Sequence, residues 1–91
     1  MNDDTYIRQN ILDDIETERS RQITLWGIQD HSPERWLAIL GEEFGEVSKE
    51  VAEGIYKEFN WERFRTELIQ TAAVSAAAVE TIDRLGLIDG A

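Results

Sequence analysis

The sequence predicts an all-α fold, an antiparallel bundle of helices in a single domain that spans residues 1–91. Apolar residues recur at the three- and four-residue spacing of helix faces, and no segment alternates as a strand does. Pro33, the single proline, and several glycines lie where helices are expected to begin and end. A chain of this length buries only about 60–65% of its unfolded surface, so oligomerisation is expected to complete the core.

The first helix is expected from about Asp4 to Leu25, with Gly27 at the position of a C-terminal stop. A loop is then expected from Gly27 to His31. The apolar stripe of this helix is interrupted and consists of Ile7, Ile11, Leu12, Ile15, Ile23 and Trp26. Residues 16–22 between its two parts are wholly polar, and they face either a site or solvent.

The second helix has a clear start. Ser32 is a good N-cap, Pro33 suits the first helical position, and Glu34 favours the positive end of the helix dipole. Gly54 is expected to end this helix. Its apolar stripe has helical spacing and consists of Leu37, Leu40, Phe44, Val47 and Val51. A ridge of small residues, which would let another backbone come close, consists of Gly41, Gly45, Ser48 and Ala52.

The third helix is expected from the N-cap Asn60 to about Leu85, before Gly86. Its main stripe consists of Trp61, Phe64, Leu68, Val79 and Ile82. The twelve residues from Leu68 to Val79 carry no charge and include five alanines, so every face is small or apolar. Such a helix is buried on most sides. Because three helices cannot readily surround it, the sequence predicts that a second subunit covers the rest.

The composition excludes several classes of protein. With 19 acidic and 9 basic residues, the chain has a formal net charge of −10, which disfavours binding to a nucleic-acid polymer. The absence of cysteine excludes disulfides and thiolate metal sites. The start of the chain is polar and acidic, unlike a secretory signal, and no apolar run approaches the roughly 20 residues that span a bilayer. We therefore expect a soluble, cytoplasmic protein that does not bind membranes.

Acidic residues cluster on the second and third helices. Glu42, Glu43 and Glu46 form an E-E-x-x-E pattern, and Glu67 is spaced i,i+3 from Gln70. At about 100° per residue, both groups lie beside an apolar stripe and so at the edge of the packed interior. Like charges at such spacings cost about 0.2–0.5 kcal/mol per pair on an exposed helix. The cost is larger at a half-buried site, because each charge also loses water.

A divalent cation would relieve this repulsion. A ligand set that contains oxygen atoms only, with no cysteine and one histidine in the chain, favours Mg²⁺ or Mn²⁺ over zinc. Magnesium usually keeps coordination positions open for water and substrate phosphates. The acidic residues therefore predict a catalytic magnesium site rather than a structural one.

At these residues the chain resembles the MazG-like, all-α nucleoside triphosphate pyrophosphohydrolases. The family pattern is E-E-x-x-E, a spacer of a dozen or more residues, and E-x-x-D. This chain has E-E-F-G-E at residues 42–46 and E-L-I-Q at residues 67–70. The W-G-I-Q segment at residues 26–29 and the alanine-rich third helix are also similar to phage and bacterial members, so the resemblance spans roughly residues 22–80.

The resemblance implies a MazG-like helical bundle that forms homodimers or homotetramers and cleaves nucleoside triphosphates to monophosphate and pyrophosphate with Mg²⁺. By position, it makes Glu43, Glu46 and Glu67 metal ligands, with Gln70 in the fourth place. It makes Glu42 the catalytic residue that orients the attacking water, or else a further ligand. Gln70 departs from the family, which has aspartate there, and its amide oxygen can ligate magnesium but adds no charge.

Four further residues are expected to bind the substrate: Trp26, Gln29, Trp36 and Lys49. An aromatic face suits a flat base, although simple packing is the alternative for both tryptophans. Gln29 recognises a base or ribose, or is a solvated loop residue. Lys49 meets a phosphate, or forms a surface ion pair with a neighbouring glutamate. His31, the single histidine, is expected to have a loop or capping role rather than a catalytic one.

Two other functions compete with the pyrophosphohydrolase. The first is a phosphoribosyl-ATP pyrophosphatase, a related helical enzyme that the same acidic pattern would serve. The second is a non-catalytic helical interaction module, whose acidic residues form a surface for a basic partner. The amide at Gln70 makes such a degenerate site conceivable.

Overall fold

The computed structural model describes residues 3–88. Met1 and Asn2, which belong to the polar start of the sequence, lie outside the described residues, as do residues 89–91. Three helices make up the fold: α1 (Asp3–Trp26), α2 (Pro33–Tyr56) and α3 (Trp61–Arg84). Residues 3–88 contain no strand, which confirms the all-α prediction. No helix within them combines the length and apolar character that crossing a membrane requires.

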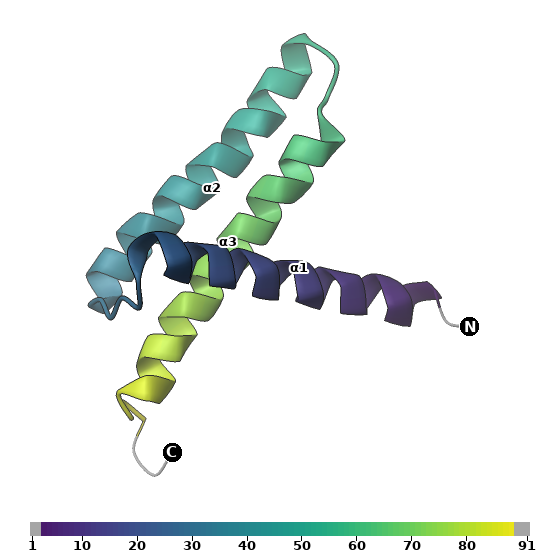
Figure 1. The fold of residues 1–91 in the computed structure, drawn as a ribbon. Helices are drawn as coiled ribbons and strands as arrows, with labels where there is room; N and C mark the ends of the chain where they lie inside the picture. Colours follow the sequence, from purple (N-terminus) through teal and green to yellow (C-terminus); the bar gives the residue numbers. More distant parts are fainter. Residues whose placement is uncertain (1–2, 89–91) are drawn as a thin grey trace.

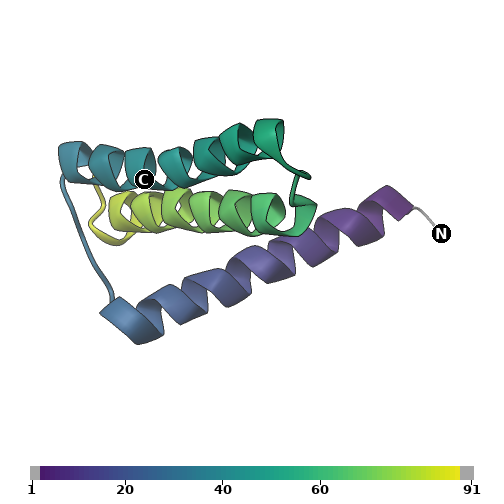
Figure 2. The same ribbon diagram turned by 90° about the horizontal axis from the view of Figure 1, so that it is seen from above.

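The three helices are arranged around α3. Helices α2 and α3 form an antiparallel hairpin, and α1 crosses α3 obliquely on the side opposite α2 (Figures 1 and 2). Among the described residues, no Cα atom of α1 comes within 8 Å of one in α2. The N-terminal half of α1 extends beyond the hairpin (Figure 1). Because α1 and α2 meet only through α3 and the loop between them, the space between α1 and α2 remains available for a cavity.

The predicted helix boundaries at three positions are confirmed. The Ser32 side chain accepts a hydrogen bond from the Arg35 backbone N–H at 3.2 Å and caps α2. The Asn60 side chain accepts one from the Arg63 backbone N–H at 2.9 Å and caps α3. Gly27 follows α1 with φ +72°, a left-handed conformation that favours glycine after a helix.

The end of α2 differs from the prediction. The helix continues past Gly54 to Tyr56. Gly54 instead makes room for the Phe59 ring, because a Cβ atom at this position would collide with that ring. Phe59 also meets Trp61 and Phe64 edge-on, with ring centroids 4.6 and 5.3 Å away. The glycine therefore permits the aromatic contact that closes the α2–α3 turn.

The core lies along a different ridge of α2 from the one that the sequence predicts. Trp36 on α2 is buried with Val74 and Ala77 of α3, and Ile39 and Leu40 pack against them. Three members of the expected stripe are instead exposed: Leu37, Phe44 and Val51. Because α2 turns the Trp36 ridge toward α3, these three residues face away from the rest of the single chain, while Leu40 of the same stripe still reaches the core.

The alanine-rich segment of α3 is buried only in part. Ala73, Val74 and Ala77 are buried, because α1 and α2 cover this part of the helix from opposite sides. Leu68 and Val79 at the ends of the segment are 44% and 53% exposed. The single chain therefore buries the middle of the charge-free segment and leaves its ends exposed, and cover of these ends by a second subunit stays a prediction.

Candidate functional site

A cavity of about 330 Å³ lies between α1, the first half of α2 and the middle of α3. This volume is within the range typical of small-molecule sites. Six of the nine predicted site residues line it: Trp26, Gln29, Trp36, Glu42, Glu43 and Gln70. The fold thus brings residues from four separate segments of the chain to one place.

The cavity wall also includes residues that sequence reasoning did not assign to the site. Glu18, Arg19, Arg21 and Gln22 of α1 line it, and Gln22 is only 7% exposed. The wholly polar stretch of residues 16–22 therefore faces the cavity, at least in part, rather than solvent alone. The interruption of the apolar stripe in this helix was the signal in the sequence. Periodicity alone, however, does not show whether a polar helix face contacts a cavity or solvent.

Within this wall, Glu18 and Arg21 form a paired-charge unit. Arg21 donates two hydrogen bonds to the Glu18 carboxylate, both at 2.8 Å. Gln22 donates a third to the same carboxylate at 3.2 Å. The hydrogen bonds from Arg21 are the main reason why the pKa of Glu18 is lowered from its ordinary value. Glu18 is therefore held as a carboxylate at the cavity.

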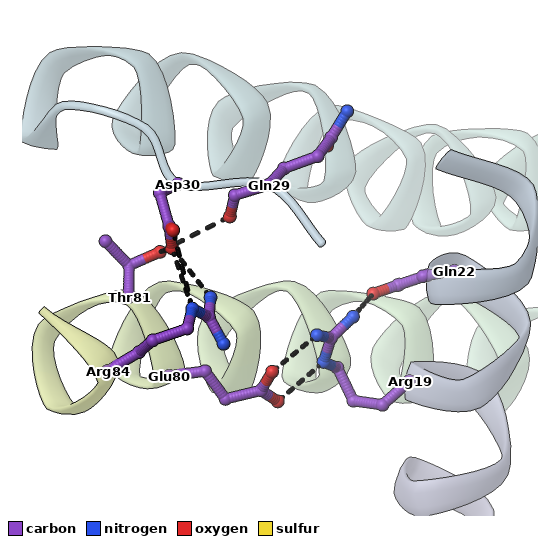
Figure 3. A network of polar contacts seen from close by, with 7 residues as sticks. All are labelled: Arg19, Gln22, Gln29, Asp30, Glu80, Thr81 and Arg84. Carbon is purple, nitrogen blue, oxygen red and sulfur yellow. Dashed lines mark hydrogen bonds and ion pairs between the residues drawn. The ribbon is translucent and has the colours of Figure 1, made fainter. Parts of the chain in front are cut away.

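A second ion pair joins α1 to α3. Arg19 donates to both oxygens of Glu80, at 2.8 and 2.6 Å, and its third contact reaches the Gln22 side-chain oxygen at 3.0 Å (Figure 3). The Arg19 side chain is only 12% exposed. The pKa of Glu80 is lowered, mainly by the hydrogen bonds from Arg19. This pair fixes the cavity wall of α1 against α3.

The loop before α2 is tied to the C-terminal part of α3. Asp30 accepts hydrogen bonds from Thr81 at 3.0 Å and from Arg84 at 2.6 Å (Figure 3). Thr81, which is buried, also contacts the backbone oxygen of Gln29 at 3.4 Å. The pKa of Asp30 is lowered, first by the Arg84 hydrogen bond and also by Thr81. These contacts hold Gln29 at the cavity.

Carboxylates of α2 and α3 face one another beside the cavity. The pKa of Glu43 is raised, first by burial and then by the negative charge of Glu67. The pKa of Glu67 is raised by burial and by the charges of Glu46 and Glu50. Burial and neighbouring negative charges therefore both make the ionised forms of Glu43 and Glu67 less favourable in the folded chain.

The remaining predicted residues lie beside the cavity rather than in its wall. Glu46, Glu67 and Lys49 are not among the residues that line it. Lys49 nevertheless lies near enough to Glu67 for its positive charge to oppose the rise in the pKa of that carboxyl, as Arg63 does. Glu50, which sequence reasoning did not assign to the site, is 5% exposed and pairs with Arg63 at 3.5 Å.

The acidic residues have the right chemistry for magnesium, but their side chains do not converge on one point. Carboxylate oxygens are the ligands that Mg²⁺ prefers. Within residues 3–88, however, no group of three or more Asp, Glu or His side chains is arranged so that it could hold a metal ion. A shared cation would therefore require the side chains of Glu43, Glu46 and Glu67 to rotate toward one another.

The two tryptophans have different surroundings. Trp26 is 59% exposed at the cavity and leaves an aromatic surface open. Trp36 is only 8% exposed and belongs to the core with Val74. The half-buried His31 ring stands edge-on against Trp36, with centroids 4.9 Å apart, and a His31 ring nitrogen lies 3.4 Å from the Gln29 side-chain oxygen. Packing therefore accounts for Trp36, and Trp26 is the tryptophan that is free to stack.

Comparisons with protein-family models, with curated proteins and with solved structures find no match to this chain. The class of protein that fold and site define is thus an all-α helical domain with an acidic, partly aromatic cavity.

Proposed function

We propose that this protein is a magnesium-dependent nucleoside triphosphate pyrophosphohydrolase of the MazG-like type, which cleaves ribo- or deoxynucleoside triphosphates to monophosphate and pyrophosphate. One observation carries the proposal. A cavity lined by Trp26, Gln29, Gln70 and Glu43 has Glu67 beside it. Burial raises the pKa of both carboxyl groups, and neighbouring negative charges raise each pKa further. Such strained acidic groups beside a cavity are typical of functional sites.

In the proposed reaction, the cavity binds the base, and the carboxylates of Glu43, Glu46 and Glu67 hold the metal ion. Trp26 supplies an exposed aromatic surface for the base, and Gln29 supplies an amide. Glu43, Glu46 and Glu67 would hold Mg²⁺, with the Gln70 amide in the fourth place. When bound, the ion screens phosphate charge and lowers the pKa of water. Glu42 lines the cavity and would orient the attacking water as a general base.

Lys49 and Arg63 are the cations placed to meet substrate phosphate. The positive charges of both oppose the rise in the pKa of Glu67, so they act at this carboxylate. Lys49 is exposed and forms none of the ion pairs found within residues 3–88. A phosphate therefore competes with no existing partner for it, whereas Arg63 is already engaged with Glu50.

We further propose that the protein forms a homodimer or homotetramer through α2. Leu37, Phe44 and Val51 are exposed and seven residues apart, so they lie along one side of α2 rather than scattered over the surface. Gly41 and Gly45 have nothing within 4 Å of the position where a Cβ would lie, so a second helix can approach closely. Light scattering should give at least twice the mass of the chain, and a monomer at micromolar concentration would contradict this assembly.

The activity is tested by measuring pyrophosphate release with Mg²⁺ from a panel of natural and modified nucleoside triphosphates, with phosphoribosyl-ATP assayed beside them. We expect turnover of at least one nucleoside triphosphate. Replacement of Glu46 with glutamine should reduce turnover at least about 100-fold, because one metal ligand loses its charge. Circular dichroism should show unchanged helicity in this variant, because Glu46 is exposed.

Glu62→Gln is the matched control, since this exposed glutamate lies on α3 in its first turn. It should retain full activity. Turnover of phosphoribosyl-ATP alone would assign the chain to the related pyrophosphatases instead. Absence of turnover across the whole panel, with metal content confirmed, would contradict both enzymatic assignments.

A further inference from the structure

The indole N–H of Trp36 is buried without a hydrogen-bond partner. Among the buried side-chain polar atoms of residues 3–88, Trp36 Nε1 is the one for which the structure provides no acceptor. Trp36 as a whole is more than nine-tenths buried, with 8% of its surface exposed. Buried tryptophan N–H groups nearly always have a partner, so this donor calls for an acceptor from outside the chain.

The position of Trp36 indicates where that acceptor comes from. Trp36 lines the cavity, while Val74 and Ala77 pack against it in the core. His31 covers another part of the ring edge-on. The ring therefore has little surface left for stacking, and the chemical group of Trp36 that still lacks a partner is its buried N–H.

The other polar groups of the cavity narrow the chemistry of the ligand. Arg19 and Arg21 are engaged in paired contacts with Glu80 and Glu18. The Gln70 side chain lines the same cavity and forms no hydrogen bond with any residue in 3–88. A fixed N–H donor that faces an exocyclic ring position distinguishes a carbonyl oxygen there, which accepts, from an amino group, which does not. The Gln70 amide can pair with the neighbouring ring nitrogen whether or not that nitrogen carries a proton.

We propose that Trp36 Nε1 donates a hydrogen bond to a ring carbonyl oxygen of the substrate base, while the exposed ring of Trp26 stacks on its face. The site then prefers bases with a carbonyl beside a ring N–H, such as hypoxanthine, guanine, uracil and thymine, over adenine. Because Nε1 itself is buried, side chains of the cavity wall must move aside before the base reaches it. This inference rests on the proposed function and adds the substrate class.

The test uses the indole N–H resonances of the ¹⁵N-labelled protein, which has three tryptophans. The Trp26→Phe and Trp61→Phe variants assign two resonances, and the remaining one is Trp36. The wild-type protein is then titrated with the α,β-methylene analogues of inosine and adenosine triphosphate in the presence of Mg²⁺. The two bases differ at position 6, which carries a carbonyl oxygen in hypoxanthine and an amino group in adenine, and at the adjoining ring nitrogen, which carries a proton only in hypoxanthine.

We expect the inosine analogue to move the Trp36 indole proton downfield and the adenosine analogue to leave it in place. The inosine analogue should also bind about tenfold more tightly, as one hydrogen bond to a buried donor permits. In Trp36→Phe, this preference should fall to about twofold or less. If that variant does not fold, the response of the Trp36 resonance in the wild-type titration alone tests the inference.

Two results would overturn the inference while the proposed function stands. In the first, both analogues bind and shift the Trp26 resonance, but the Trp36 resonance does not respond to inosine. In the second, inorganic pyrophosphate moves the Trp36 resonance as far as the inosine analogue does, which makes a phosphate oxygen the acceptor. By contrast, absence of binding by every nucleotide contradicts the proposed function itself and removes the inference with it.

Discussion

Replacement of Glu43 with glutamine is expected to slow pyrophosphate release at least about 100-fold and, without metal, to make the protein more stable at neutral pH. The pKa of Glu43 is raised above its ordinary value of 4.5 by burial and by the charge of Glu67. The folded state therefore binds a proton more readily than the unfolded state does. As pH falls through the raised pKa toward 4.5, the free energy of unfolding contributed by this group increases. At neutral pH, the ionised carboxylate lowers that free energy.

Melting of wild type and Glu43→Gln from pH 7 to pH 4 without divalent cations measures this effect. The variant should be more stable at pH 7, and its advantage should disappear as pH falls. The variant must be compared with wild type because Glu18, Asp30 and Glu80 have lowered pKa values. As pH falls, these three groups decrease the free energy of unfolding, whereas Glu43 increases it. A loss of stability at pH 7 would contradict our assignment, because it would make Glu43 a structural partner rather than a strained carboxylate.

With Mg²⁺ present, the order should reverse. A cation that binds the folded state stabilises it in proportion to its affinity and concentration. Wild type should therefore gain stability on addition of Mg²⁺, whereas Glu43→Gln should gain less and should release pyrophosphate at least about 100-fold more slowly.

The largest loss of stability is expected from replacement of Arg19 with methionine. The change keeps most of the side-chain volume but leaves the Glu80 carboxylate and the Gln22 amide oxygen without their donor. Glu80 is 38% exposed and Arg19 only 12%, so water compensates in part. We expect a loss of about 2 kcal/mol, which corresponds to about 10 °C in melting temperature for a domain of this size.

Arg65→Met is the matched control for this prediction. Arg65 pairs with Asp14 at 2.7 Å, nearly the distance of the Arg19–Glu80 pair, and the pair joins the same two helices. Its side chains are 53% and 48% exposed, so the pair should contribute no more than about 1 kcal/mol. Thermal melting of the two variants compares them directly. Equal losses would show that burial of the Arg19 pair is not what ties α1 to α3.

The helices and their ends were largely predictable, because local chemistry determines them. Ser32 and Asn60 cap their own helices, and Gly27 adopts the left-handed conformation that ends α1. Gly54 was misjudged, because its role depends on Phe59, a contact that forms only after the chain turns.

The packing was less predictable than the helices. Two adjacent ridges of α2 are apolar enough to form a core, and periodicity could not decide which one meets α3. The structure buries the ridge of Trp36 and exposes that of Leu37 and Phe44. Only the position of a neighbouring helix decides such a choice, and position is a long-range property.

The sequence predicted those residues of the candidate site whose charge and helical spacing form a recognisable pattern, and no others. Six predicted residues line one cavity: Trp26 at the end of α1, Gln29 in the loop, Trp36, Glu42 and Glu43 on α2, and Gln70 on α3. The role of the polar stretch of α1 could not be assigned, because Arg19 finds its partner Glu80 across the fold. The unpaired Trp36 N–H likewise has no sequence signal, since it is defined by the absence of a neighbour.

The most direct test of the central claim is calorimetric titration of Mg²⁺ into the protein, alone and with α,β-methylene nucleoside triphosphates. We predict saturable Mg²⁺ binding that is strengthened by nucleotide, lost in Glu67→Gln and retained in Glu62→Gln. Absence of Mg²⁺ binding under both conditions would contradict the metal-dependent enzyme and would favour an acidic, non-catalytic surface for a basic partner.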